Sequence, residues 1–246
     1  MKPLSSLAVA GLAMLALVAG CATTPPSADF SQIVAAPDRS DADRKNDQRR
    51  KPLELYGFTG ARPGMKVLDM GAGGGYSTEL LARAVAPAGV VYSQTPPGMF
   101  PGAIKAYEAR AKTPAMKNAV RVERPFEDPL PAGVSGLDLV TFFFFYHDTV
   151  HMGVDRARMN RALYDALKPG GILVVADHSA RAGEGANVTK SLHRIEESVV
   201  RRELEAAGFR FVAAGDFLRN PDDARDVPVS KNTVPNDEFV LKFRKP

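Results

Sequence analysis

Histidines and acids gather in two short segments of this 246-residue chain. Tyr146, His147 and Asp148 follow one strongly apolar stretch, and Asp177 and His178 follow another. Histidine suits proton transfer because its ordinary pKa of about 6.5 lies near neutrality, and an adjacent carboxylate raises that pKa. We therefore predict that His147 acts as a general base, which Asp148 or Asp177 orients. Tyr146 and His178 complete the predicted catalytic set. The alternative is that His147 and Asp148 only cap the following helix.

The same histidines also permit a metal site. His147 and His151 are four residues apart, which places them on one face of a helix, with the neighbouring acids close by. This region holds no cysteine and no H-E-x-x-H pattern, so we expect no bound metal. A metal-dependent hydrolase using His147, His151 and His178 stays as a minor alternative. The fourth histidine, His193, is expected to open a later helix as a packing or substrate-side residue.

A glycine-rich turn follows the first apolar strand of the folded part. The stretch Val67–Tyr76 reads V-L-D-M-G-A-G-G-G-Y, with glycine at 71, 73 and 75. Glycine tolerates positive φ and lets the backbone approach a ligand without interference from a Cβ. The helix expected over 78–85 would point its first N–H groups at whatever lies over this turn. Tyr76 stands where the dinucleotide pattern G-x-G-x-x-G needs a third small residue, so that pattern fits poorly.

The order D-x-G-x-G-x-G that begins at Asp69 resembles the first motif of the class I S-adenosylmethionine-dependent methyltransferases. Leu167–Gly171, which reads L-K-P-G-G before a buried strand, is another segment similar to that family. The resemblance implies S-adenosyl-L-methionine as the cofactor. The residues that it implies around the cofactor are Asp69, Gly71, Gly73, Gly75 and Tyr76.

Two further cofactor contacts follow from the same resemblance. In the family an acid after the second strand binds both ribose hydroxyls, and Gln94 holds that position here with an amide that donates and accepts but carries no charge. An acid after the third strand often binds the adenine amino group, which makes Asp128 or Glu127 the candidate. The segments D-M-G-A-G-G-G-Y-S-T-E, S-Q-T-P-P, Y-H-D, D-H-S-A and L-H-R-I together resemble a group of exported bacterial predicted methyltransferases.

The residues named above must be positioned by strands and helices. Sequence patterns typical of strands and of helices alternate along the chain. A charged helix is expected over 41–57, interrupted at Pro52. Strands are predicted at 66–70, 90–93, 120–123, 137–145, 172–177, 209–217 and 238–243, and helices at 78–85, 103–112, 156–167 and 195–206. We predict an α/β fold with a doubly wound, mostly parallel seven-stranded sheet, Rossmann-like, and a C-terminal antiparallel strand. Ligands of such sheets bind beyond the carboxyl ends of the strands.

The first residues indicate export. An apolar stretch from Leu4 to Val18 ends in L-V-A-G-C, which resembles a bacterial lipobox with Cys21 as the lipidated residue. We therefore expect a lipoprotein signal peptide at 1–20, a flexible tether at 21–39 and a methyltransferase-like domain at 40–246. Cys21 is the only cysteine, which excludes a disulfide within one chain. The expected location is the periplasmic side of the bacterial envelope, with the outer membrane favoured because Ala22 follows the cysteine.

Composition narrows the class of partner. The net charge is only +4, and the basic residues are scattered among acids, so nucleic acid is not expected as a partner. We expect an S-adenosylmethionine-dependent methyltransferase that is tethered to a membrane and acts on a small-molecule or envelope acceptor. The alternative is a non-catalytic ligand-binding module on the same fold. The oligomeric state and the identity of the acceptor stay open.

Overall fold

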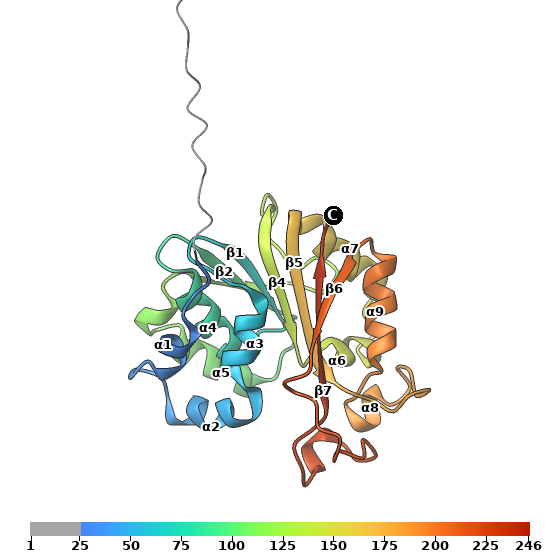
Figure 1. The fold of residues 1–246 in the computed structure, drawn as a ribbon. Helices are drawn as coiled ribbons and strands as arrows, with labels where there is room; N and C mark the ends of the chain where they lie inside the picture. Colours follow the sequence, from blue (N-terminus) through green and yellow to red (C-terminus); the bar gives the residue numbers. More distant parts are fainter. Residues whose placement is uncertain (1–25) are drawn as a thin grey trace, which may run out of the picture.

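Seven strands form one sheet in the order β3-β2-β1-β4-β5-β7-β6 (Figure 1). The computed structural model describes residues 26–246. The strands are β1 (Lys66–Met70), β2 (Val90–Thr95), β3 (Ala119–Glu123), β4 (Leu137–Phe143), β5 (Leu167–His178), β6 (Arg210–Gly215) and β7 (Glu238–Arg244). Within this sheet β7 pairs antiparallel with both β5 and β6, and the pairs among β1 to β5 are parallel. The predicted fold class is confirmed.

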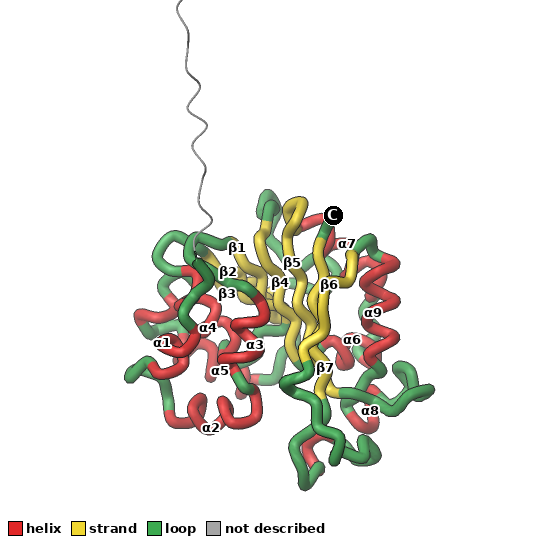
Figure 2. The backbone as a smooth tube through the Cα atoms, in the orientation of Figure 1, coloured by secondary structure: helices red, strands yellow, loops and turns green. Residues whose placement is uncertain are grey.

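Helices cover both faces of this sheet (Figure 2). They are α1 (Phe30–Ala35), α2 (Asp41–Arg50), α3 (Pro52–Thr59), α4 (Tyr76–Val85), α5 (Pro101–Arg110), α6 (Tyr146–His151), α7 (Arg156–Ala166), α8 (Thr189–Leu192) and α9 (Glu197–Ala206), with short 3₁₀ turns at Pro114–Met116 and Val229–Lys231. One apolar core joins α1, α3 and α4 to the sheet, and a second joins α7 and α9 to the opposite face.

The apolar strands β4 and β5 explain why the sheet is buried on both faces. Along β4, Val140 and Phe142 belong to the core under α7 and α9, while Leu139 and Phe143 belong to the core under α3 and α4. Successive side chains of a strand point to opposite faces, so a continuous apolar run is needed where both faces are covered. The Phe-rich stretch therefore specifies a central strand.

Strand order brings the predicted chemistry to one edge of the sheet. Met70 at the end of β1 pairs with Phe142 of β4, and Phe143 of β4 pairs with Ala176 of β5. The carboxyl ends of these parallel strands therefore meet at the same edge, where the order of the strands reverses around β1 and β4.

The predicted flexible tether is wrong for its second half. Helix α1 lies inside the stretch 21–39, and Asp29 caps it by accepting hydrogen bonds from the N–H groups of Ser31 and Gln32. Phe30 is buried against Tyr56, with ring centroids 5.8 Å apart. The apolar contact stabilises a helix too short to persist alone. The predicted signal peptide and Cys21 lie outside the described residues, and within 26–246 no helix is long and apolar enough to cross a bilayer.

Candidate functional site

The glycine turn has the backbone that its sequence predicts. Gly71, Gly73 and Gly75 all have positive φ, at 63°, 53° and 82°, which L-residues rarely adopt. A Cβ at Gly71 would lie 3.1 Å from Cγ of Phe145, whereas a Cβ at Gly73 would meet only a backbone oxygen at 3.8 Å. The turn therefore needs glycine for its conformation and leaves room above Gly73.

Asp69 lies beneath this turn, and both of its carboxylate oxygens accept hydrogen bonds from the protein. Thr78 donates a 2.7 Å hydrogen bond to Oδ2, and Thr141 donates a 2.9 Å hydrogen bond to Oδ1. Burial raises the pKa of Asp69 to about 6, although both hydroxyls lower it. Asp69 therefore ties β1 to α4 and β4 and holds the turn in place.

Gln94 at the end of β2 is buried and hydrogen-bonded on both sides of its amide. Its Oε1 accepts from the N–H of Gly71 at 2.9 Å, and its Nε2 donates to the carbonyl of Arg124 at 2.7 Å. An acid at this position would face the Arg124 carbonyl without a proton to donate. The amide thus joins the glycine turn to the end of β3.

Arg50 is a site residue that sequence reasoning missed. Its guanidinium carbon stacks 3.9 Å from the ring centroid of Phe144, and its Nε is buried without a hydrogen-bond partner. Burial and the charge of Arg49 lower the pKa of Arg50 to about 10, so it stays cationic at neutral pH. The charge of Arg50 lowers the pKa of Asp69, and the charge of Glu238 raises the pKa of Arg50. The cation therefore lies near both the glycine turn and β7. No motif marks it, because α2 is charged along its whole length.

Ion pairs hold α2 over the glycine turn. Tyr76 donates to Oδ1 of Asp47 at 2.6 Å, and Arg39 pairs with Asp47 at 2.7 Å. Arg110 of α5 pairs with Asp43 at 2.7 Å and donates from Nε to the carbonyl of Gly74. The hydroxyl of Tyr76 therefore secures α2, and the leading helices form one side of the candidate site.

Three of the four histidines gather around Asp148. Nδ1 of His147 lies 2.7 Å from Oδ1 of Asp177, and Nε2 of His147 lies 3.1 Å from Oδ1 of Asp148. His193 approaches the same Asp148 oxygen at 3.0 Å, and His151 lies 3.6 Å from it. The structure thus brings together His147, Asp148 and Asp177 as predicted and adds His193 from a distant segment.

These contacts determine the protonation of His147. Burial lowers the pKa of His147, but the charge of Asp177 and hydrogen bonds with Asp148 and Asp177 outweigh burial and raise it to about 10. The pKa of Asp148 is lowered, because its bonds to His147 and His193 outweigh the effect of burial. Both ring nitrogens of His147 thus have carboxylate partners, which leaves neither free to accept a proton from an acceptor.

Two predicted site residues lie away from this centre. The hydroxyl of Tyr146 donates to Glu203 at 2.8 Å and accepts from Asn160 at 2.7 Å, inside the core under α7 and α9. Asp128 pairs with Arg124 at the surface and lines a separate cavity beside α7. The proposed catalytic role of Tyr146 and the adenine contact of Asp128 therefore have no support from the geometry.

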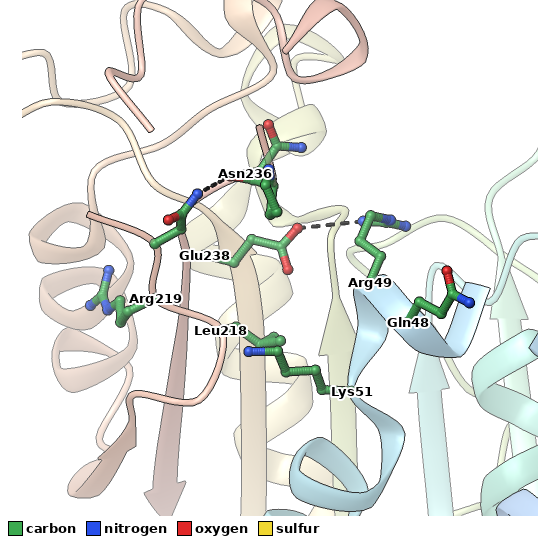
Figure 3. A pocket seen from close by; sticks show the side chains of 9 residues that line it. Gln48, Arg49, Lys51, Leu218, Arg219, Asn236 and Glu238 are labelled. Atoms are coloured by element: carbon green, nitrogen blue, oxygen red, sulfur yellow. Dashed lines mark hydrogen bonds and ion pairs between the residues drawn. The ribbon is translucent and has the colours of Figure 1, made fainter. Parts of the chain in front are cut away.

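A cavity of about 450 Å³ opens beside the histidine cluster, between α2 and the segment that leads into β7 (Figure 3). Glu238 lies at its centre, with Oε1 3.4 Å from Arg49 and 3.0 Å from Nδ1 of His178. Arg49, Lys51 and Arg219 line the cavity, but Arg49 pairs with Glu238, and Arg219 pairs with Glu197 and Asp237. Among the described residues Lys51 is therefore the lining cation that has no carboxylate partner and could meet a ligand with a negative charge.

Comparison with known families finds a match for the central part of the chain. Residues 68–175, from β1 through most of β5, match the family described as methyltransferase domain. The match covers less than half of the chain. Around it, α1 to α3 and the strands β6 and β7 extend the domain beyond the matched residues.

Relatives of the methyltransferase domain agree with the fold. Protein-L-isoaspartate O-methyltransferase 1 of Arabidopsis thaliana is 33% identical over 115 residues, which are 46% of each chain, so this chain spans about half of that relative. An S-adenosylmethionine-dependent methyltransferase from Aquifex aeolicus is similar over 89% of this chain and 99% of its own, at 19% identity and a TM-score of 0.61. The cyclase SpnF is similar over 90% of this chain and 88% of its own, at 18% identity and a TM-score of 0.58. At these identities the solved structures bear on the fold alone.

Proposed function

We propose that this protein is an S-adenosylmethionine-dependent methyltransferase that methylates an anionic small-molecule or envelope acceptor. The observation that carries the proposal is the glycine turn, which lies inside the matched domain at the edge where the strand order reverses. Ligands of open α/β sheets bind at this edge, and three glycines with positive φ allow a ligand to approach the backbone there.

The residues at this edge fit the cofactor. The open space above Gly73 suits close approach of a ligand, and the buried, unpartnered Nε of Arg50 offers a donor. Arg50 would pair with the carboxylate of the cofactor, since a guanidinium binds carboxylates with charge-assisted hydrogen bonds. Gln94 and Asp69 hold the turn that the cofactor contacts. S-adenosylmethionine supplies a methyl group on positively charged sulfur.

The acceptor group that fits best is a carboxylate. The cavity presents Lys51 to a ligand, and this cation would orient an anion, while Arg49 and Arg219 share their charges with nearby carboxylates. A carboxylate is already a nucleophile at neutral pH, so it needs no general base, and His147 has no ring nitrogen free to serve as one. The Arabidopsis relative is named an O-methyltransferase of an acidic residue.

The membrane tether completes the proposal. The lipobox-like residues 17–21 support lipid attachment at Cys21, and the chain from 22 to 29 would then link the anchor to α1. The enzyme would face the periplasm from the outer membrane and reach acceptors of the envelope. The alternative, a ligand-binding module without transfer, draws on the uncharged and internally bonded Gln94.

Calorimetry with S-adenosylmethionine and S-adenosylhomocysteine tests the cofactor. We expect both to bind, and Arg50→Met to weaken binding about 10–100-fold, which corresponds to a charged hydrogen bond of about 1.5–3 kcal/mol. Arg49→Met is the matched control, because it removes the neighbouring arginine from the acceptor cavity and should leave cofactor affinity unchanged. Absence of heat with either compound up to millimolar concentration, from a folded chain, would rule out the proposal.

Labelled methyl transfer tests the acceptor chemistry. With a mixture of small carboxylic acids and envelope extract, we expect label in methyl esters, which mild alkali releases as methanol. Lys51→Met should raise KM for the acceptor more than it lowers kcat, since this cation acts in binding. Label that resists alkali would point to a nitrogen or carbon acceptor instead. Cofactor binding without any transfer would favour the ligand-binding module.

A further inference from the structure

Three ligand atoms from α6 and the end of α8 form a compact triangle. Oδ1 of Asp148 lies 3.1 Å from Nε2 of His147 and 3.0 Å from Nδ1 of His193, and the two nitrogens are 3.3 Å apart. Tetrahedral zinc with bonds of about 2.0–2.1 Å places neighbouring ligand atoms about 3.3–3.4 Å apart. The triangle is thus close to one face of such a tetrahedron.

Asp177 orients one of these ligands from behind. Its Oδ1 lies 2.7 Å from Nδ1 of His147, and its Oδ2 accepts the backbone N–H of His147 at 2.8 Å. A histidine that binds a metal through one ring nitrogen commonly has the other held by a carboxylate, which fixes the tautomer and the ring plane. Here Asp177 leaves Nε2 of His147 turned toward Asp148 and His193.

The backbone of His193 supports a ligand role. His193 has φ 53° and ψ 46°, in the left-handed region, where a non-glycine residue is strained. Strain of this kind persists where the surrounding structure holds it, and it often marks functional positions. Its side chain remains 45% exposed while its Nδ1 points at Asp148. The triangle is therefore reached from solvent.

We propose that His147, Asp148 and His193 bind one divalent transition-metal ion, with Zn²⁺ as the best fit. Two imidazole nitrogens and one carboxylate suit zinc better than Mg²⁺ or Ca²⁺, which prefer oxygen ligands. The carboxylates of Asp148 and Asp177 offset the charge of the ion. Three protein ligands leave a fourth position open to water, as in catalytic rather than structural zinc sites.

The other two histidines lie outside this site. Nδ1 of His178 faces Glu238 at 3.0 Å, and His151 lies 3.6 Å from Asp148 at the rim. The ligand set therefore differs from the one that sequence spacing suggested, since it takes His193 in place of His151 and His178. The proposal is independent of methyl transfer, because none of the three ligands is assigned to the cofactor.

Titration of the purified chain, without a histidine tag and after treatment with chelator, tests the site. We expect one Zn²⁺ per chain, a rise in melting temperature on adding Zn²⁺, and visible absorption from a Co²⁺-loaded sample. Mg²⁺ and Ca²⁺ should give neither heat nor a melting shift. A folded wild-type chain that takes up no Zn²⁺ would overturn the proposal.

Two variants and a matched control locate the ion. His193→Asn should weaken Zn²⁺ binding at least about 10-fold, and Asp148→Asn should do the same. Both retain folding, because His193 is half-exposed, asparagine tolerates the left-handed backbone, and Asp148→Asn is isosteric. His151→Ala, whose ring lies 5.8 Å from that of His193, should keep wild-type affinity. Equal loss in His151→Ala, or none in His193→Asn, would refute the ligand assignment.

Discussion

A buried carboxylate in the glycine turn has a consequence for stability. Asp69 is 1% exposed and accepts hydrogen bonds from Thr78 and Thr141, yet burial still raises its pKa to about 6 from an ordinary value of 3.8. The folded protein thus favours the neutral acid more than the unfolded chain does. The contribution of Asp69 to stability is complete below about pH 4 and is lost as the pH rises through about 6.

Asp69→Asn should therefore gain stability, relative to wild type, as the pH rises. A shift of about two pKa units corresponds to about 3 kcal/mol between about pH 4 and about pH 8. Urea unfolding of both proteins across this range measures the difference, and the wild-type–mutant gap should change most between about pH 4 and about pH 6. A gap that is constant with pH would show that Asp69 does not titrate in the folded state.

At the scale of elements, the start of α4 depends on one glycine for two separate reasons. Gly75 has φ 82°, and a Cβ there would lie 3.0 Å from Tyr107 and 3.1 Å from Arg110 of α5. Gly98 has nearly the same φ, 81°, but has no atom within 4 Å of an added Cβ. A comparison of the two glycines therefore separates the cost of backbone strain, which both share, from the cost of a steric clash, which only Gly75 would have.

Alanine at these two glycines should give different losses. Gly98→Ala carries backbone strain alone and should cost about 1–2 kcal/mol. Gly75→Ala adds a clash with α5 and should cost about 1–3 kcal/mol more, because packed neighbours must move. Chemical denaturation of both variants measures the free energies of unfolding. Equal losses would mean that α5 yields to the new methyl group without cost.

A buried ion pair anchors the segment between β6 and β7. Arg194 is 0% exposed, pairs with Asp223 at 2.8 Å and donates further hydrogen bonds to Ser179, Val227 and Asn236. The segment supplies one wall of the cavity in Figure 3. One guanidinium therefore joins the end of β5 to this wall.

Arg194→Met should destabilise the protein by about 3–5 kcal/mol, because it leaves the carboxylate of Asp223 buried without its cationic partner, held only by the backbone N–H groups of Arg225 and Asp237. Arg201→Met is the matched control, since its pair with Glu205 is exposed on both sides and should matter by no more than about 1 kcal/mol. Urea unfolding measures the free energy of unfolding of both variants. Similar losses from both variants would contradict the structural role assigned to Arg194.

At the scale of the whole molecule, we expect Cys21 to determine where the proposed enzyme works. In a bacterial host that processes lipoproteins, the native chain should be recovered in the membrane fraction and be released by detergent but not by salt. Cys21→Ser should leave the membrane fraction, because the variant lacks the thiol that would carry the lipid. Mass spectrometry of the N-terminus checks the lipid directly. Membrane recovery of Cys21→Ser, without detergent, would contradict lipid anchoring.

The elements that dominate the fold were predictable from local patterns. The strand at 66–70 was predicted to the residue, and the Phe-rich stretch and Ile172–Asp177 marked β4 and β5 because strands buried on both faces are apolar throughout. The positive φ of the glycine turn also follows from residue type. Helices α1, α6 and α8 were missed as elements, because each has six residues or fewer and depends on contacts made elsewhere.

By itself, the sequence determined the doubly wound, mostly parallel sheet, the glycine turn and the meeting of His147 with Asp177, because neighbouring strand ends share one edge. Only the tertiary structure decided what those side chains do there. It committed the amide of Gln94 to Gly71 and Arg124, brought Arg50 over Phe144, and added His193 to Asp148. These contacts join segments far apart in the chain. Sequence periodicity could not predict them, because it describes only which face of a single helix or strand is buried.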